Sequence, residues 1–154
     1  MNYWDKKLIR DQLSKKLQKL KPLLQLPVPK GGWIKTIRES LGMTTYDLAD
    51  RAGLNQSRIS RIESAEAKGK IKLSTLEKIA DALGMKFVYG FVSEHDLEAM
   101  VREQAKKIAR ERMNRVSHSM KLESQELDED DRQEALNDLI NKILVEDPNK
   151  FWRM

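Results

Sequence analysis

Residues 44–63 read TTYDLADRAGLNQSRISRIE, and this stretch decides the fold. Thr44 with Asp47 three residues later is typical of a helix start, because each side chain can bond the backbone N–H of the other residue. This helix is expected to end at Gly53, since glycine readily takes the conformation that stops a helix. It is expected to bury Leu48, Ala49 and Ala52.

A second helix begins shortly after Gly53. Asn55 can cap it, and Gln56 is its expected first residue. Ile59 and Ile62 form its apolar side, which leaves a polar side of Gln56, Ser57, Arg58, Ser60 and Arg61. A short turn containing glycine crosses two helices steeply and frees the N-terminal half of the second helix to enter a DNA major groove. The spacing therefore predicts a helix-turn-helix.

Two more short helices flank this pair and can complete a small shared core. Trp33 to Leu41 is expected to form one helix, stopped by Gly42, with Ile34, Ile37 and Leu41 on one face. The other is expected to open with a capping box over residues 74–77 and to bury Leu76, Ile79, Ala80 and Leu83.

The N-terminal region predicts one more helix, over residues 5–21. Its leucine stripe consists of Leu13, Leu17, Leu20 and Leu24. Residues 26–32, rich in proline and glycine, are expected to be a linker. The stripe suits docking on the rest of the chain and a dimer seam equally well.

Residues 86–92 (KFVYGFV) predict the one strand of the chain. A strand must pair, and three partners are open: residues 71–73, the same segment of a second copy, which we favour, or another protein. Ser93 with Asp96 is then expected to cap a helix running to about Met120. A last helix is expected to open at the acidic residues 128–131 and to end before Pro148.

These elements predict a mainly all-α protein with four parts. They are an N-terminal helix and linker (1–30), a helix-turn-helix domain (31–85), a strand for dimer or partner pairing (86–92) and a helical region for partner binding or dimerisation (93–154).

Composition narrows the functional classes. The net charge of +5 conceals a basic body and an acidic end: residues 1–122 hold 25 Lys/Arg against 14 Asp/Glu, and residues 123–154 hold 4 against 10. A basic body suits nucleic acid, and an acidic end suits self-masking or a protein partner, although both could be solvated helix faces.

The chain has no cysteine, and its two histidines, His95 and His118, lie apart in the sequence. We expect no metal, no cofactor, no membrane segment and a cytoplasmic location.

The pattern running from Gly42 through residues 59–63 to Gly84 resembles the Xre/Cro-repressor family. The resemblance implies a lambda-repressor-like domain of four to five helices that binds double-stranded DNA. It implies that Arg38 and Glu63 form a structural pair and that Lys35, Thr45 and Tyr46 contact phosphates. Thr45 departs from the family, which usually has glutamine there. The residues implied to face DNA are Gln56, Ser57, Arg58, Ser60 and Arg61.

Residues 30–35, 68–71 and 87–89 resemble a second family, called mobile mystery protein A, over nearly the whole chain. That family resembles antitoxins encoded beside a Fic-domain protein, which usually transfers AMP. Fic inhibitors share a helical motif, [Ser/Thr]-x-x-x-Glu-[Gly/Asn], which Ser119 and Glu123 fit while Ser124 departs from it. The resemblance implies that Glu123 pairs with an arginine of the enzyme that would otherwise hold the ATP γ-phosphate.

The sequence thus favours a homodimeric repressor that reads an inverted repeat, inhibits a Fic-domain partner and regulates its own operon. The alternative is a stand-alone Xre-type regulator whose extension only dimerises it or binds a small effector. An enzyme is disfavoured, because the sequence has no glycine-rich phosphate loop, histidine–carboxylate cluster or nucleophile elbow.

Overall fold

The computed structural model describes residues 1–122, 128–146 and 152. In this described part the chain forms seven α-helices and one short 3-10 helix, and it divides into two compact units. The central unit is Leu23–Gly90, and the terminal unit combines Met1–Pro22 with Phe91–Met154. No helix among the described residues is both long and apolar enough to cross a membrane.

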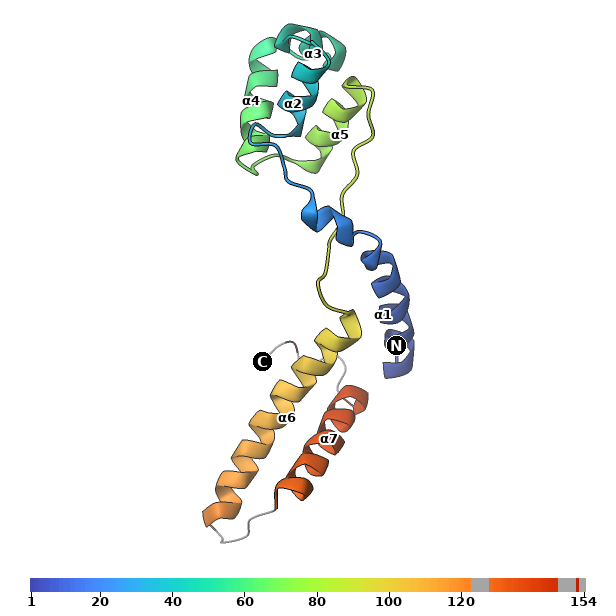
Figure 1. Ribbon diagram of the computed structural model, residues 1–154, viewed down its shortest axis with the longest axis vertical. Helices are drawn as coiled ribbons and strands as arrows, with labels where there is room; N and C mark the ends of the chain where they lie inside the picture. Colours follow the sequence, from blue (N-terminus) through green and yellow to red (C-terminus); the bar gives the residue numbers. More distant parts are fainter. Residues whose placement is uncertain (123–127, 147–151, 153–154) are drawn as a thin grey trace. The chain divides into compact units, whose positions relative to one another are not determined.

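The central unit holds four helices around one apolar core (Figure 1). They are α2 (Trp33–Ser40), α3 (Thr45–Ala52), α4 (Gln56–Ala67) and α5 (Leu73–Ala82). Of the expected inward positions, Ile37, Leu76 and Ala80 are partly buried, Leu41 is exposed and the others are buried. The buried core consists of Ile34, Leu48, Ala49, Ala52, Ile59, Ile62, Ile79 and Leu83.

A buried ion pair joins α2 to α4. Arg38 donates from Nε to Oε1 of Glu63 at 2.6 Å and from Nη2 to Oε2 at 3.1 Å. Its Nη1 donates to the carbonyl of Met43 at 2.8 Å. The hydrogen bonds to Glu63 raise the pKa of Arg38, and both side chains are less than 10% exposed. The predicted structural role of these two residues is confirmed.

The start of α5 differs from the prediction. The helix begins at Leu73 with Lys72 as its N-cap and without a side-chain cap. The expected capping box at residues 74–77 is therefore wrong. The N–H groups of Thr75 and Leu76 bond the carbonyl of Lys72, so these residues lie inside the first turn of the helix.

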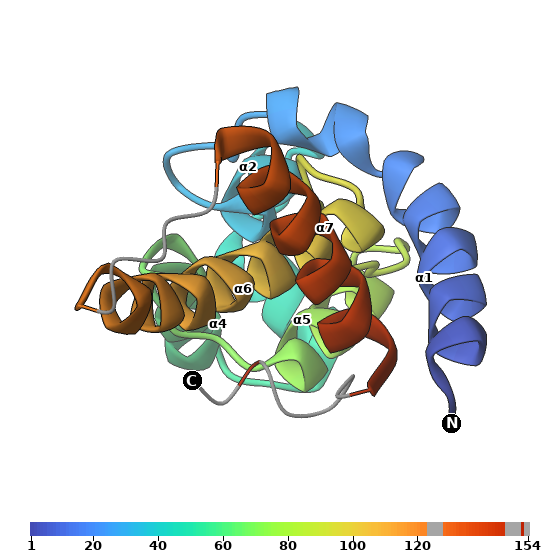
Figure 2. The ribbon, with the colours of Figure 1, turned by 90° about the horizontal axis from the view of Figure 1, so that it is seen from below.

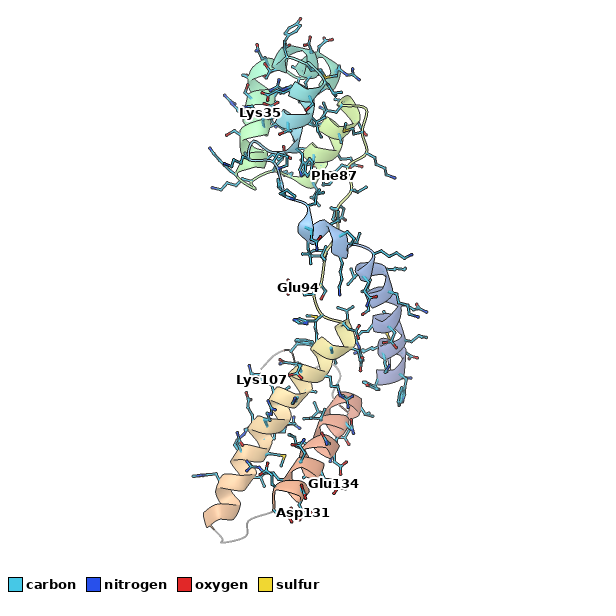
Figure 3. All side chains as sticks on the ribbon, in the orientation of Figure 1. Lys35, Phe87, Glu94, Lys107, Asp131 and Glu134 are labelled. Atoms are coloured by element: carbon cyan, nitrogen blue, oxygen red, sulfur yellow. The ribbon has the colours of Figure 1, made fainter. Side chains whose placement is uncertain are left out.

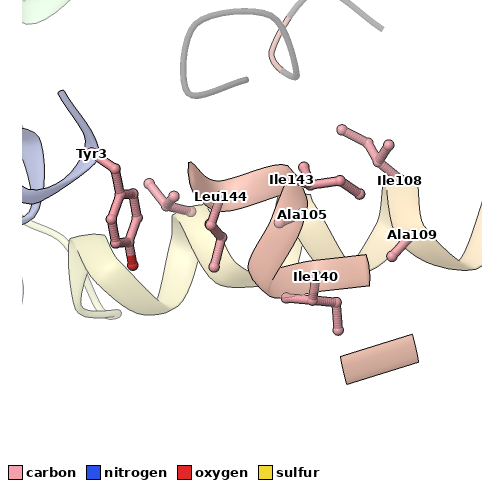
Figure 4. Close-up of a cluster of buried hydrophobic side chains, with 8 residues drawn as sticks. Tyr3, Ala105, Ile108, Ala109, Ile140, Ile143 and Leu144 are labelled. Carbon is pink, nitrogen blue, oxygen red and sulfur yellow. The ribbon is translucent and has the colours of Figure 1, made fainter. Parts of the chain in front are cut away.

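The terminal unit combines α1 (Tyr3–Gln18) with α6 (Leu97–Leu122) and α7 (Glu129–Glu146); the 3-10 helix η1 (Lys21–Gln25) follows α1. Helices α6 and α7 lie side by side and run in opposite directions (Figure 1), and they cross in the view from below (Figure 2). Ala105 and Ala109 are fully buried, and such small side chains let two helices approach closely. The core consists of Tyr3, Val101, Ala105, Ile108, Ala109, Ile140, Ile143 and Leu144 (Figure 4).

Helix α1 docks on this unit through a mostly polar face. Its buried residues are Tyr3 and Ser14, whereas Leu13 of the predicted leucine stripe is 43% exposed. The Ser14 hydroxyl accepts the N–H of Leu97, the first residue of α6, at 3.2 Å. The expected cap from Ser93 and Asp96 is wrong, because the Ser93 hydroxyl bonds His95 instead.

Residues 86–92 form no strand, and no residue in the described ranges belongs to one. The predicted strand is wrong for the single chain, because a strand needs a neighbour that satisfies its backbone groups. Residues 71–73, the one intrachain candidate, instead lead into and begin α5.

Candidate nucleic-acid interface

A helix-turn-helix is formed by α3, a three-residue turn and α4. Gly53 stops α3 in the left-handed conformation, with φ 65° and ψ 35°. The N–H of Leu54 then bonds the carbonyl of Ala49 at 2.9 Å, which closes the end of the helix. Asn55 caps α4 through its Oδ1, which accepts the N–H of Arg58 at 2.8 Å. These predicted boundaries are confirmed.

Helix α4 has one buried side and one exposed side. Ile59 is fully buried and Ile62 is 6% exposed, and both pack in the core of the central unit. The five residues predicted to face DNA are all exposed on this helix: Gln56, Ser57, Arg58, Ser60 and Arg61. The two isoleucines therefore fix which side of α4 is available to a ligand.

A hydrogen bond links the first residues of the two helices. Nε2 of Gln56 donates to Oγ1 of Thr45 at 2.8 Å. This bond fixes the orientation of the Gln56 amide at the exposed end of α4, and so reduces the side-chain entropy lost on binding. It also gives Thr45 a role that was not predicted from the sequence, where this residue was noted only as a departure from the glutamine usual in the family.

The N-terminus of α3 is capped as expected. Asp47 accepts from the hydroxyl and the backbone N–H of Thr44, and both bonds lower the pKa of its carboxyl group. The Asp47 N–H bonds the Thr44 hydroxyl in return at 3.2 Å. Beside this cap, Tyr46 is 67% exposed, so its phenol is open to solvent next to the positive end of the helix dipole.

The structure does not bring Lys35 together with the other candidates. Both oxygens of Glu66 accept backbone N–H groups of Trp33 and Ile34, each at 2.9 Å, so α2 begins beside the C-terminal end of α4. Lys35 is the next residue of α2 (Figure 3). Glu66 lies ten residues beyond Gln56, which is about 15 Å along a helix.

The exposed charge from α4 to the start of α5 is positive. Residues 56–72 contain two carboxylates, and both are engaged internally: Glu63 with Arg38, and Glu66 with the N-terminus of α2. Neither carboxylate of the segment therefore pairs with any of its five cations. They are Arg58, Arg61, Lys68, Lys70 and Lys72.

The two proposed inhibitory residues have a different status. Ser119 belongs to the last turn of α6, and Glu123 lies outside the described residues. Among the described residues, no group of three or more His, Cys, Asp or Glu side chains could hold a metal ion.

Comparison with known proteins identifies the central unit. Residues 34–89 match the family model HTH_3, described as Helix-turn-helix, and the match runs from the first turn of α2 to a point beyond α5. A search of curated proteins and a search of solved structures each found no match. Nothing in these comparisons supports the resemblance to mobile mystery protein A. Residues 34–89 are therefore similar to an Xre-type helix-turn-helix domain, and a domain of this kind suggests a DNA-binding transcriptional regulator.

Proposed function

We propose that the chain is a sequence-specific repressor that inserts the N-terminal half of α4 into the DNA major groove. The observation that carries this proposal is the division of α4: Ile59 and Ile62 anchor one side, and the polar residues cover the other. In this arrangement arginine can pair with guanine and Gln56 with adenine, each through two hydrogen bonds. The base-reading residues we propose are Gln56, Ser57, Arg58, Ser60 and Arg61.

Phosphate contacts set the position of the domain on DNA without reading sequence. Thr45 and Tyr46 suit this role, because they lie at the N-terminus of α3, next to the start of α4. The geometry favours these two residues over Lys35, which follows residues bound to the far end of α4. We keep Lys35 as a proposed phosphate contact at a different place from the contacts of Thr45 and Tyr46.

The regulator is proposed to act as a homodimer on an inverted repeat in the cytoplasm. One helix-turn-helix reaches few base pairs, and two copies related by a two-fold axis read two half-sites about one helical turn apart. Each copy adds its own phosphate contacts, so operator affinity is expected to fall steeply with salt.

The experiment compares the double variant Arg58→Ala/Arg61→Ala with the wild type on DNA from upstream of the gene for this chain. Each lost base contact costs about 1–3 kcal/mol, so operator affinity at 150 mM salt should fall by about 30-fold or more. The matched control is Arg110→Ala/Arg112→Ala, which removes the same charge from exposed positions of α6 and should leave affinity within about threefold. Equal affinity of the α4 variant and the wild type would overturn the proposal.

We also propose that the chain is an antitoxin that binds and inhibits a Fic-domain partner. The support is the likeness of residues 30–35, 68–71 and 87–89 to that antitoxin family, together with the acidic composition after residue 122. In this proposal Glu123 pairs with an enzyme arginine, and Ser119 supplies the first position of the motif. The alternative, a stand-alone regulator, keeps the DNA-binding role and omits the partner.

One experiment distinguishes the antitoxin from the stand-alone regulator. The chain is purified with the product of the neighbouring reading frame, and AMP transfer by that product is measured with and without the chain. Inhibition that is lost in Glu123→Ala and kept in Glu129→Ala would support the motif. A neighbour that neither binds nor is inhibited would leave the stand-alone regulator.

A further inference from the structure

The segment Lys86–Glu94, which follows α5, is largely exposed and rich in apolar residues. Val88 is 74% exposed, Tyr89 73% and Phe91 82%. Among the hydrogen bonds of the described residues, none involves the backbone of residues 86–92. The segment therefore presents apolar side chains together with free backbone donors and acceptors, as an edge strand does.

Its sequence would place aromatic residues on one side of a strand. The rings of Phe87 and Tyr89, two residues apart, stack with centroids 6.2 Å apart and an interplanar angle of 16°. In a strand, Phe91 would lie on the same side as these two rings. The opposite side of a strand would carry Lys86, Val88, Gly90, Val92 and Glu94.

One register of self-pairing places the two charges of this segment, Lys86 and Glu94, opposite each other. In an antiparallel pair with Gly90 opposite Gly90 of the second copy, Lys86 faces Glu94, Val88 faces Val92 and Tyr89 faces Phe91. Each of these pairs forms twice, and opposite charges and aromatic pairs are favourable across strands. Moving the axis to Tyr89 pairs Phe87 with Phe91 but places Glu94 opposite Gly84, and moving it to Phe91 pairs Lys86 with Asp96 but places Glu94 opposite Val88.

Charge and packing also favour a second copy over an unrelated strand. Lys86 and Glu94 are both exposed and have no ion-pair partner in the part of the chain that the structure describes. Phe87 and Val88 also line an apolar groove of about 300 Å³ within the central unit, with Trp33, Ile37 and Leu83 on its walls. A two-stranded ribbon is marginal alone, and such a floor supplies the packing that it needs.

We infer that residues 86–94 pair with the same residues of a second copy as an antiparallel ribbon whose two-fold axis passes through Gly90. This inference rests on the proposed homodimer and names its interface. The ribbon begins at Lys86, four residues beyond the end of α5, and its axis relates the two copies of α4 by two-fold symmetry. An inverted-repeat operator has the same symmetry.

Single cysteines test the register directly, because the chain has no cysteine of its own. Gly90→Cys should form a disulfide-linked dimer under mild oxidation, since paired strands bring opposite Cα atoms within the 4.4–6.8 Å that a disulfide requires. Gly90 is not among the glycines with positive φ, so it can accept a side chain. Val88→Cys is the control, because its twin would lie roughly 13 Å away along the ribbon.

Charge reversal gives a second test in the full-length chain, with sedimentation equilibrium in the absence of DNA as the readout. Lys86→Glu and Glu94→Lys each place like charges opposite each other twice, so each alone should weaken the dimer by about tenfold. An equimolar mixture of the two variants restores both attractive pairs and should recover wild-type affinity. Glu111→Lys is the matched control on an exposed position of α6, and it should leave dimerisation unchanged.

The outcomes separate this interface from the proposed function. Gly90 crosslinking together with recovery in the mixture supports the ribbon. The ribbon is overturned if the charge reversals leave dimer affinity unchanged, or if Val88→Cys crosslinks as fast as Gly90→Cys. Either result is still compatible with a homodimer. A wild-type monomer overturns both, while DNA binding by α4 is judged separately by the arginine variants.

Discussion

The two units of this chain each contain an arginine–glutamate pair, and the two pairs are built differently. In the central unit, Arg38 and Glu63 share two hydrogen bonds, and their side chains are 8% and 9% exposed. In the terminal unit, Arg10 gives Glu98 one bond at 2.7 Å, and both side chains are about twice as exposed. The Nη2 atom of Arg10 is buried without a hydrogen-bond partner.

The difference follows from how far apart in sequence the packed elements lie. The central unit is folded from consecutive short helices, whose caps and turns position Arg38 and Glu63. The terminal unit joins α1 to α6 across most of the chain, where the Tyr3 hydroxyl also donates to Glu98 at 3.1 Å. The comparison indicates that the central unit is a rigid platform for α4 and that the attachment of α1 is the weaker part.

The largest expected effect concerns the central ion pair. Arg38→Met should lower the free energy of unfolding of the central unit by about 3–5 kcal/mol, because it leaves the Glu63 carboxylate buried and unpaired. The double variant Arg38→Met/Glu63→Leu should recover most of this loss. Urea unfolding followed by hydrogen exchange in α2–α5 measures both. A loss below about 1 kcal/mol would contradict the difference between the two units.

The cap of α2 is the next most sensitive feature of the central unit. Gly32 has φ 82°, and a Cβ there would lie 2.7 Å from Oε2 of Glu66. Gly32→Ala should therefore cost about 2–3 kcal/mol, from backbone strain and from the displaced cap. Gly31→Ala is the matched control, since its Cβ would meet only Cδ of Lys35 at 3.5 Å. Thermal unfolding of the two variants checks the contrast.

Breaking the terminal pair should cost less than breaking the central one. Arg10→Met should destabilise the terminal unit by about 2 kcal/mol, because Glu98 is partly solvated and still accepts the hydrogen bond from the Tyr3 hydroxyl. Hydrogen exchange should report the change in α1 and at the start of α6, with α2–α5 unaffected. Lys15→Met, at an exposed position of the same helix, should change little. An Arg10 variant as costly as the Arg38 variant would remove the distinction.

The terminal unit should also be sensitive to alkaline pH. Burial, reinforced by the nearby Glu98 carboxylate, raises the pKa of the Tyr3 hydroxyl. A raised native pKa means that the stabilisation is fully present below the unfolded value of about 10 and is lost as pH rises through the native value. Tyr3→Phe should abolish this dependence and cost about 1 kcal/mol at pH 7. Unfolding curves between pH 8 and 11 test it, and an identical alkaline slope in the variant would contradict the assignment.

The smallest effect is expected at the exposed cap of α3. Thr44→Ala should destabilise the central unit by about 1 kcal/mol at neutral pH. Because the pKa of Asp47 is lowered, its stabilisation is present above the unfolded value of about 3.9 and is lost as pH falls through the native value. The variant should therefore lose less stability on acidification than the wild type. Ser40→Ala, which removes a hydroxyl bonded within α2, is the control.

Much of the candidate site could be predicted from the sequence, because its determinants are local. Gly53 and Asn55 set the turn, and the spacing of Ile59 and Ile62 fixes the exposed side of α4. The hydrogen bond between Gln56 and Thr45 was not predicted, although both residues start a helix of the pair. The position of Lys35 could not be inferred, because it depends on which end of α4 the start of α2 meets.

The sequence by itself determined the bounds of α2 and α3, the start of α4 and most of the inward residues of the central core, because capping residues and helical periodicity act over a few positions. The tertiary structure alone decided that Glu66 caps α2, that Ser14 meets the start of α6 and that α1 turns a polar face inward. It also decided that residues 86–92 form no strand within one chain. Each of these outcomes depends on a partner group distant in sequence, and local preference carries no information about that partner.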